Sequence, residues 1–212
     1  MSEEPMTSGL NKLDIALVGV GGQGIILASD ILAEVGLIAG FDVKKTDSLG
    51  MSQRGGSVLS FVRWAAKVYS PMPKRGDVDV LLALEKLEAG RAADWLRPGG
   101  VAIVNDHAIQ PPAVRSGTAR YPSDDELGRL AGLRTERVDF VNGPRLAEGL
   151  GNARVVNVVL LGYLSALLPI ELGDWHEALE RLVPARIRTI NLRALGAGRE
   201  LALSRDELAI GG

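Results

Sequence analysis

A glycine-rich segment close to the amino terminus has the residue types and the spacing of a phosphate-binding loop. The letters GVGGQG satisfy the pattern G-x-G-x-x-G, and the residues that would form the cradle are Gly19, Gly21, Gly22, Gln23 and Gly24. Glycine allows a tight turn and a close approach of the backbone, and the free amides at the start of a helix attract an anion. The segment therefore predicts a site for a ligand that carries phosphate. The alternative is that the glycines only pack a helix against a strand.

A second polar loop, at 51–57, carries donors that suit an anionic group. It combines a hydroxyl, a carboxamide and a guanidinium with two glycines, and its candidate binding residues are Ser52, Gln53, Arg54, Gly55 and Gly56. A guanidinium holds a phosphate or a carboxylate through two parallel hydrogen bonds, and glycines can expose backbone amides. Loops that follow the first and second strands of a doubly wound sheet open at the same edge, so both loops are expected to face one crevice. The alternative is an ordinary surface loop with an exposed arginine.

The pattern of a dinucleotide-binding site also needs an acidic residue about 20 positions after the glycines, where it binds a ribose hydroxyl. Asp47 lies at about that distance from Gly24, but Lys44 and Lys45 precede it closely. Acidic residues are common at strand ends, so Asp47 is weak support for a nicotinamide cofactor.

Two amino-acid counts limit the chemistry of the chain. Its 212 residues include no cysteine, which excludes a disulfide, a thiolate nucleophile and an iron–sulfur cluster held by this chain. The two histidines, His107 and His176, lie in unrelated contexts and are interpreted as surface or capping residues. We therefore expect no catalytic residue and no metal ligand here. Redox chemistry would be carried by a bound organic cofactor or by another chain.

Charge and hydropathy argue against two classes of partner. The 24 Lys and Arg residues against 26 Asp and Glu give a formal net charge of −2, which does not favour binding to nucleic acid or to an anionic membrane. The first eleven residues are polar and acidic, unlike a signal peptide. The most apolar run, 155–170, is shorter than the roughly 20 residues that span a bilayer. We expect a cytoplasmic protein.

The elements that would position the two loops alternate between strands and helices. An almost unbroken apolar strand at 13–20 precedes the glycines, an amphipathic helix at 25–35 follows them, and a second strand is expected at 41–46. Further strands are expected at 58–64, 78–84 and 101–105, with a helix between the last two. This order predicts an α/β fold with a doubly wound, mostly parallel sheet and a Rossmann-like opening.

The rest of the chain is expected to be mainly helical. We predict a flexible tail at 1–11 and a single α/β domain at 12–212, whose helical extension spans about 153–205. A short strand near 137–141 could extend the sheet edge. The last helix is basic, with arginines at Arg186, Arg188, Arg193 and Arg199. We interpret these arginines as a solvated face; the alternative is a docking surface for an acidic partner.

Two polar residues stand where strands are expected to end, at the edge where a ligand crevice would lie. Glu85 follows the strand at 78–84, and Asn105 ends the strand at 101–105. Each also has a structural interpretation, Glu85 as a carboxylate at a helix start and Asn105 as a turn cap.

Longer strings of letters resemble a known family. The letters VGVGGQGIILASDILAE and DVKKTDSLGMSQRGGSVLSFVR, the stretch at 69–105 and the terminal INLRALGAGRE are similar to gamma-type subunits of 2-oxoacid:ferredoxin oxidoreductases. Among them, the small (beta) subunits of indolepyruvate ferredoxin oxidoreductases are the nearest branch. The resemblance covers most of 12–200 and is weakest at 107–150.

The resemblance implies a share in a larger enzyme. Such enzymes decarboxylate a 2-oxoacid oxidatively with coenzyme A, reduce ferredoxin, and release an acyl-CoA and carbon dioxide. Thiamine diphosphate, magnesium and iron–sulfur clusters are then expected on a larger alpha subunit, in an α2β2 assembly, with aryl-2-oxoacids as substrates. The sequence is consistent with this division of roles, because the chain lacks the residues that would hold these cofactors. It has no cysteine for a cluster, and it lacks the GDG…N pattern of a thiamine diphosphate site, since Gly76 and Asp77 are followed by Val78.

The resemblance also implies roles for the two loops. Gly21, Gly22, Gln23 and Gly24 would cradle phosphate groups of coenzyme A. The residues of the second loop, Ser52, Gln53 and Arg54, would either contact coenzyme A or seal the thiamine site of the alpha subunit. Two alternatives stay open: a free-standing NAD(P)-binding oxidoreductase, and a structural subunit without a ligand.

Overall fold

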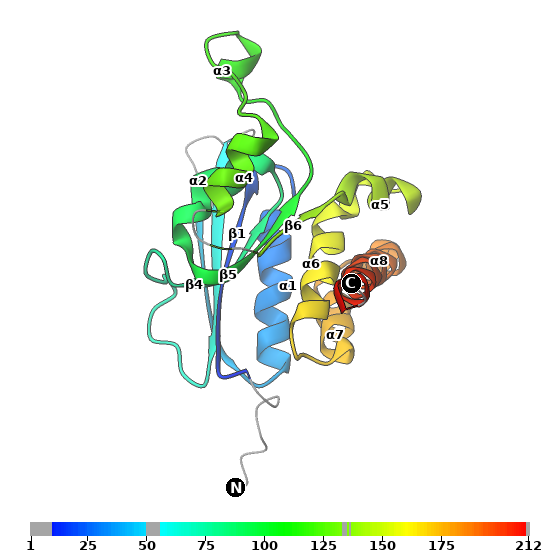
Figure 1. Cartoon of the computed structure of the whole chain (residues 1–212). Helices are drawn as coiled ribbons and strands as arrows, with labels where there is room; N and C mark the ends of the chain where they lie inside the picture. The colour runs from blue at the N-terminus through cyan, green and yellow to red at the C-terminus, as the bar shows by residue number, and fades with distance from the viewer. Residues whose placement is uncertain (1–9, 50–55, 133–134, 136, 211–212) are drawn as a thin grey trace, which may run out of the picture.

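The protein folds around one mixed sheet of six strands with helices on both faces (Figure 1). The computed structural model describes residues 10–49, 56–132, 135 and 137–210. The strands are β1 (Lys12–Val20), β2 (Asp42–Leu49), β3 (Ser57–Ala65), β4 (Val78–Ala83), β5 (Leu96–Asn105) and β6 (Arg137–Val141). Their order across the sheet is β2-β3-β1-β4-β5-β6. The predicted α/β class with a mostly parallel sheet is confirmed, because only β3 runs against the other five strands.

The position of β3 distinguishes the opening from a simple Rossmann unit. β3 lies between β1 and β2 and pairs antiparallel with both. The short connection between β2 and β3 explains this, because a hairpin loop joins antiparallel strands whereas a parallel crossover needs a dozen or more residues. β1 and β2 therefore run parallel to each other without touching.

The strand β1 shows why its sequence is apolar at almost every position. Ile15 and Leu17 pack into one hydrophobic cluster, whereas Ala16 and Val18 pack into the other. Successive side chains of a strand point to opposite faces, so a strand covered on both sides has no solvent-facing register.

Two groups of helices cover the sheet (Figure 1). On one face lie α1 (Ile25–Ile38), α6 (Val156–Leu167), α7 (Leu172–Leu182) and α8 (Ala185–Ile210). On the other lie α2 (Lys86–Ala92) and α4 (Asp124–Gly132). The remaining short elements are η1 (Ala93–Trp95), α3 (Pro112–Arg115), α5 (Gly143–Gly149) and η2 (Ala153–Val155). Among the described residues, no helix combines the length and the hydropathy of a membrane span.

The basic helix α8 uses two of its arginines inside the fold. Arg199 donates to the Ser165 carbonyl at 2.6 Å, and Arg188 donates to the Glu180 carbonyl at 2.8 Å. Arg186 and Arg193 are exposed. The arginines of this helix are thus divided between helix packing and solvent.

Candidate functional site

The glycine loop lies at the sheet edge where the parallel strands end. β1 ends at Val20, α1 begins at Ile25, and Gly24 precedes the helix in the left-handed conformation, with a φ of 78°. A Cβ on Gly24 would lie 2.6 Å from Nδ2 of Asn157, whereas a Cβ on Gly22, with a φ of 104°, would meet nothing within 4 Å. Gly24 is therefore required by packing as well as by the backbone. Gly22 presents its bare backbone to open space, as a ligand cradle needs.

Gln23 holds this loop to the neighbouring strands. Its Oε1 accepts a hydrogen bond from the amide of Val20 at 2.7 Å, and its Nε2 donates to the carbonyl of Leu84 at 2.8 Å. The Leu84 carbonyl accepts a second bond, at 3.0 Å, from Nδ2 of Asn105. Both polar atoms of the Gln23 side chain are therefore used to hold the loop in place. The phosphate contacts that the sequence analysis expected from Gln23 would instead be made by backbone amides of the loop.

Only the end of the second loop, at Gly56 and Ser57, lies within the described residues, and this end contacts the glycine loop. The amide of Gly21 donates to the carbonyl of Gly56 at 2.9 Å, and Val20 pairs with Ser57 across β1 and β3. The chain that connects β2 to β3 therefore begins and ends at the edge where α1 starts. The other predicted residues of this loop, Ser52, Gln53, Arg54 and Gly55, lie outside the described residues, and their roles stay predictions.

A cavity of about 500 Å³ opens beside Gly22 and is of the size of a small-molecule site. It lies over the carboxyl ends of β4 and β5 and the amino ends of α1 and α6. Its polar lining consists of one carboxylate, one guanidinium and uncharged side chains: Glu148, Arg154, Gln23, Asn105, His107 and Asn157. The start of α1 and the exposed Arg154 provide positive potential for an anionic ligand.

A second cavity of about 350 Å³ lies next to Gly21. Two arginine side chains that the sequence alone did not single out line it. Arg91 and Arg115 line it together with the buried Glu88. Glu88 accepts bonds from Ser57 Oγ at 2.5 Å and from Arg91 at 2.6 Å. The sequence could have indicated this pair, because Glu88 and Arg91 are three residues apart and therefore lie on one face of a helix.

Glu85 and Asn105 have structural duties at this edge. Glu85 is only 1 % exposed and caps α2 by accepting from the amide of Glu88 at 2.9 Å; Ile109 and Tyr121 also donate to it. Burial, and then the bond to Glu85, raises the pKa of Tyr121. Asn105 Oδ1 accepts from the amide of Gly143 at 3.1 Å. The interpretation of Glu85 as a helix-start carboxylate is confirmed.

Asp47 is poorly placed to bind a ribose beside the glycine loop. It pairs with Ser60 of β3, which in turn pairs with Leu17 of β1, so β3 separates Asp47 from the strand that carries the glycines. Two strand spacings amount to about 10 Å. The carboxylate accepts a bond from Ser60 and pairs with Lys45 at 3.0 Å. Asp47, the main residue in favour of a dinucleotide site, therefore already has its carboxylate bonded to side chains of β2 and β3.

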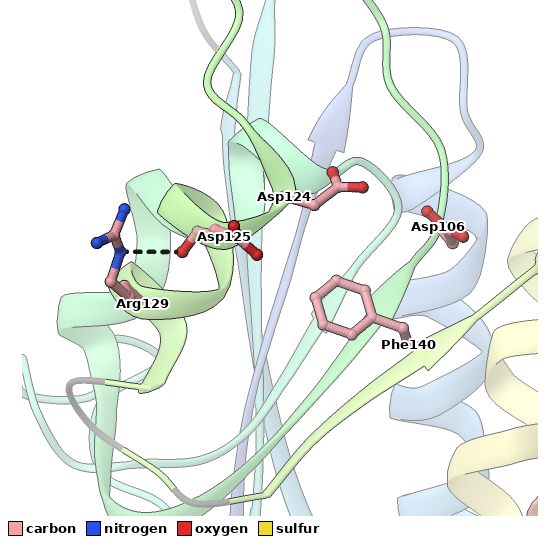
Figure 2. A pocket seen from close by; sticks show the side chains of 5 residues that line it. All are labelled: Asp106, Asp124, Asp125, Arg129 and Phe140. Carbon is pink, nitrogen blue, oxygen red and sulfur yellow. Dashed lines mark hydrogen bonds between the residues drawn. The ribbon is translucent and has the colours of Figure 1, made fainter.

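A larger hollow of about 670 Å³ has the wrong charge for a phosphate ligand (Figure 2). It is lined by Asp106, Asp124, Asp125, Arg129 and Phe140. Lys86 reaches Asp106 at 3.1 Å and Asp124 at 2.7 Å. Burial opposes the charge of Lys86, but these carboxylates outweigh it and raise the pKa of the lysine. Three carboxylates against the Arg129 guanidinium and the Lys86 ammonium leave a net negative charge, which disfavours an anionic ligand, so the glycine loop remains the candidate site.

Comparison with known proteins defines the class. Residues 14–201 match the model of the pyruvate ferredoxin/flavodoxin oxidoreductase family. The chain therefore belongs to this family, as a small subunit of a 2-oxoacid:ferredoxin oxidoreductase. The resemblance inferred from the sequence is confirmed.

The curated relatives specify the branch. The chain is 40 % identical over 202 residues to the indolepyruvate oxidoreductase subunit IorB of Archaeoglobus fulgidus, covering 94 % of this chain and 100 % of the relative. It is 35 % identical to the subunit of the same name from Thermococcus kodakarensis, covering 91 % and 97 %.

Solved structures share the fold. The gamma subunit of a keto/oxoacid ferredoxin oxidoreductase from Geobacter sulfurreducens aligns with a TM-score of 0.67 and 26 % identity, over 91 % of this chain and 99 % of that one. The 2-oxoglutarate:ferredoxin oxidoreductase of Magnetococcus marinus, solved with 2-oxoglutarate, coenzyme A and succinyl-CoA bound, aligns with a TM-score of 0.71 and 23 % identity. This chain covers only 32 % of that longer one.

Proposed function

We propose that this chain is the small subunit of a cytoplasmic indolepyruvate ferredoxin oxidoreductase, and that it binds coenzyme A and completes the active site of a larger alpha subunit. The identity to the IorB subunits over nearly the whole chain supports the branch. The observation that carries the ligand assignment is the open backbone of Gly22 beside a cavity of about 500 Å³. Aryl-2-oxoacids would be the substrates, and the assembly would be α2β2.

The reaction would convert an aryl-2-oxoacid carboxylate and coenzyme A into an acyl-CoA and carbon dioxide, with two electrons passing to oxidised ferredoxin and the thiol proton released to solvent. Thiamine diphosphate with magnesium and iron–sulfur clusters, all on the alpha subunit, would supply the decarboxylation and the electron transfer. This chain would contribute binding and orientation, which bring the thiol of coenzyme A to the partner's site.

The residues here fit a ligand that carries several phosphates. The amides of Gly22 and Gly24 and the start of α1 would receive the pyrophosphate, because helix starts favour anions. Arg154 at the cavity rim, and Arg54 from the second loop, would bind the remaining negative charge. Arg54 could instead seal the thiamine site, as the sequence analysis left open.

Co-expression with the larger subunit tests the proposal. We expect a brown complex that reduces ferredoxin or a viologen dye only when an arylpyruvate and coenzyme A are both present. A colourless, solitary chain that quenches or enhances the fluorescence of a reduced nicotinamide would contradict it and favour the NAD(P)-binding alternative.

Replacing Arg54 tests whether the chain binds a ligand at all. In the assembled enzyme, Arg54→Ala should raise the KM for coenzyme A about tenfold or more, because a charge-assisted hydrogen bond contributes roughly 1.5–3 kcal/mol. Arg186→Ala, which removes an exposed arginine of α8, is the matched control and should change nothing. If Arg54→Ala leaves both KM and rate unchanged, the structural-subunit alternative gains.

A further inference from the structure

The smaller cavity, of about 350 Å³, adjoins the larger cavity that opens beside Gly22. Ile109 lines both cavities, and the glycine loop presents Gly21 to the smaller one and Gly22 to the larger one. The amide of Ile109 donates to Oε1 of Glu85 at 3.0 Å, so the wall that the cavities share is fixed to the cap of α2. Because residues of α2 and α3 line the smaller cavity, we name it the α2–α3 cavity. The two cavities are neighbouring compartments on either side of one loop.

The α2–α3 cavity has an apolar wall held in an ordered turn. The amides of Val114 and Arg115 both donate to the carbonyl of Pro111, at 3.0 and 3.1 Å, and this turn carries two consecutive prolines. A wall that is already rigid loses little conformational entropy when a ligand binds. Apolar walls with a few polar groups are typical of small-molecule sites and suit a flat heterocyclic ring. The apolar lining is made of Val20, Ile109, Pro111 and Pro112.

The α2–α3 cavity has one cation whose charge is not compensated. Glu88, which is 4 % exposed, compensates Arg91, because its carboxylate accepts from that guanidinium at 2.6 Å. Arg115 is exposed, and no group among the described residues pairs with its guanidinium. Two arginines and one carboxylate leave a net charge of +1 in the lining. A guanidinium with all its donors free is well suited to bind a phosphate.

Coenzyme A carries phosphate at two separate places. Its pyrophosphate lies in the middle of the molecule, and its 3′-phosphate lies on the ribose of the adenosine end. The cavity beside Gly22 lies against the start of α1, which favours the pyrophosphate. The α2–α3 cavity, one residue away along the loop, combines apolar walls with a single uncompensated cation. These properties are complementary to an adenine ring and one phosphate.

We propose that the α2–α3 cavity holds the adenosine end of coenzyme A and that Arg115 binds the 3′-phosphate. The inference rests on the proposed function, because it takes coenzyme A as the ligand. Arg115 is then a specificity-determining residue: it distinguishes coenzyme A from a nucleotide that lacks this phosphate. Arg154, which lines the other cavity, acts on the pyrophosphate and makes no such distinction.

Dephospho-coenzyme A is a probe that tests this assignment, because it keeps the thiol and the pyrophosphate and lacks only the 3′-phosphate. The KM for each of the two thiols is measured for the wild type, Arg115→Ala and Arg154→Ala, all assembled with the larger subunit. Arg154 is the matched control, since it is also exposed and its guanidinium has no partner among the described residues. The melting temperature of each complex shows that it folds.

We expect Arg115→Ala to raise the KM for coenzyme A about tenfold or more, because it removes charge-assisted hydrogen bonds to the 3′-phosphate. Its KM for dephospho-coenzyme A should stay within about a factor of two of the wild-type value, since that ligand lacks the phosphate. Arg154→Ala should raise both KM values by the same factor. No melting temperature should change, because neither guanidinium has a partner to lose.

Several outcomes would overturn the assignment while leaving the proposed function intact, provided that the complex still needs coenzyme A. These are equal effects of Arg115→Ala on both thiols, no effect on either, and equal KM values of the wild type for the two. If Arg154→Ala is the variant that affects coenzyme A alone, the 3′-phosphate lies in the cavity beside Gly22 and the assignment is wrong. A wild-type complex whose activity does not depend on coenzyme A overturns both proposals.

Discussion

Two glycines have the same backbone handedness and the same open surroundings but lie at different ends of α1. Gly22 precedes the helix with a φ of 104°, and Gly40 follows it with a φ of 87°. A Cβ would meet nothing within 4 Å at either position. An alanine would therefore add the same kind of backbone strain, about 1–2 kcal/mol, at both. Only the one at position 22 would project into the proposed coenzyme A cavity.

This pair separates ligand binding from stability. Gly22→Ala and Gly40→Ala should lower the free energy of unfolding by similar amounts, measured by urea denaturation of the isolated chain. In the assembled enzyme, only Gly22→Ala should raise the KM for coenzyme A, because its methyl group occupies the cradle. Equal KM values for the two variants would place the coenzyme away from Gly22.

At the scale of elements, α4 begins with a reciprocal cap. The amide of Ser123 donates to the Glu126 carboxylate at 2.7 Å, and the amide of Glu126 donates to Ser123 Oγ at 3.3 Å. Arg120 adds two bonds to the same carboxylate, at 2.9 and 2.7 Å. The Arg120 bonds first, and then the Ser123 amide, lower the pKa of Glu126 from 4.5 to about 2.

The direction of this shift predicts how the cap responds to acid. Because the pKa of Glu126 is lower in the folded state, its contribution to stability is present above about pH 4.5 and is lost as the pH falls towards 2. Arg120→Ala should move the pKa back towards 4.5, as measured by a carbon-13 NMR titration of the carboxyl group. The exposed Arg145 offers the control, since Arg145→Ala should leave the Glu126 titration where it is.

The contact between α6 and α8 depends on glycine in a different way. A Cβ on Gly198 of α8 would overlap the carbonyl oxygen of Val159 in α6, whereas a Cβ on Gly196, two residues earlier, would meet nothing within 4 Å. Gly198→Ala must push the helices apart and should lower the free energy of unfolding by about 2–3 kcal/mol. Gly196→Ala should raise it by about 0.5–1 kcal/mol, since alanine is the better helix former. Urea denaturation measures both, and equal signs would mean that the helices do not meet at Gly198.

At the scale of the whole molecule, the sequence predicts where the strands lie in the chain better than it predicts which strands pair in the sheet. The apolar run at 13–20 correctly indicates a strand covered on both faces, because both faces must then be filled. Alternation in 58–64 indicates a strand but not its partners, so the insertion of β3 between β1 and β2 went unpredicted. The structural role of Gln23 was equally hidden, because its acceptor at Leu84 is 61 residues away in the chain. Pairings over such separations leave no local pattern.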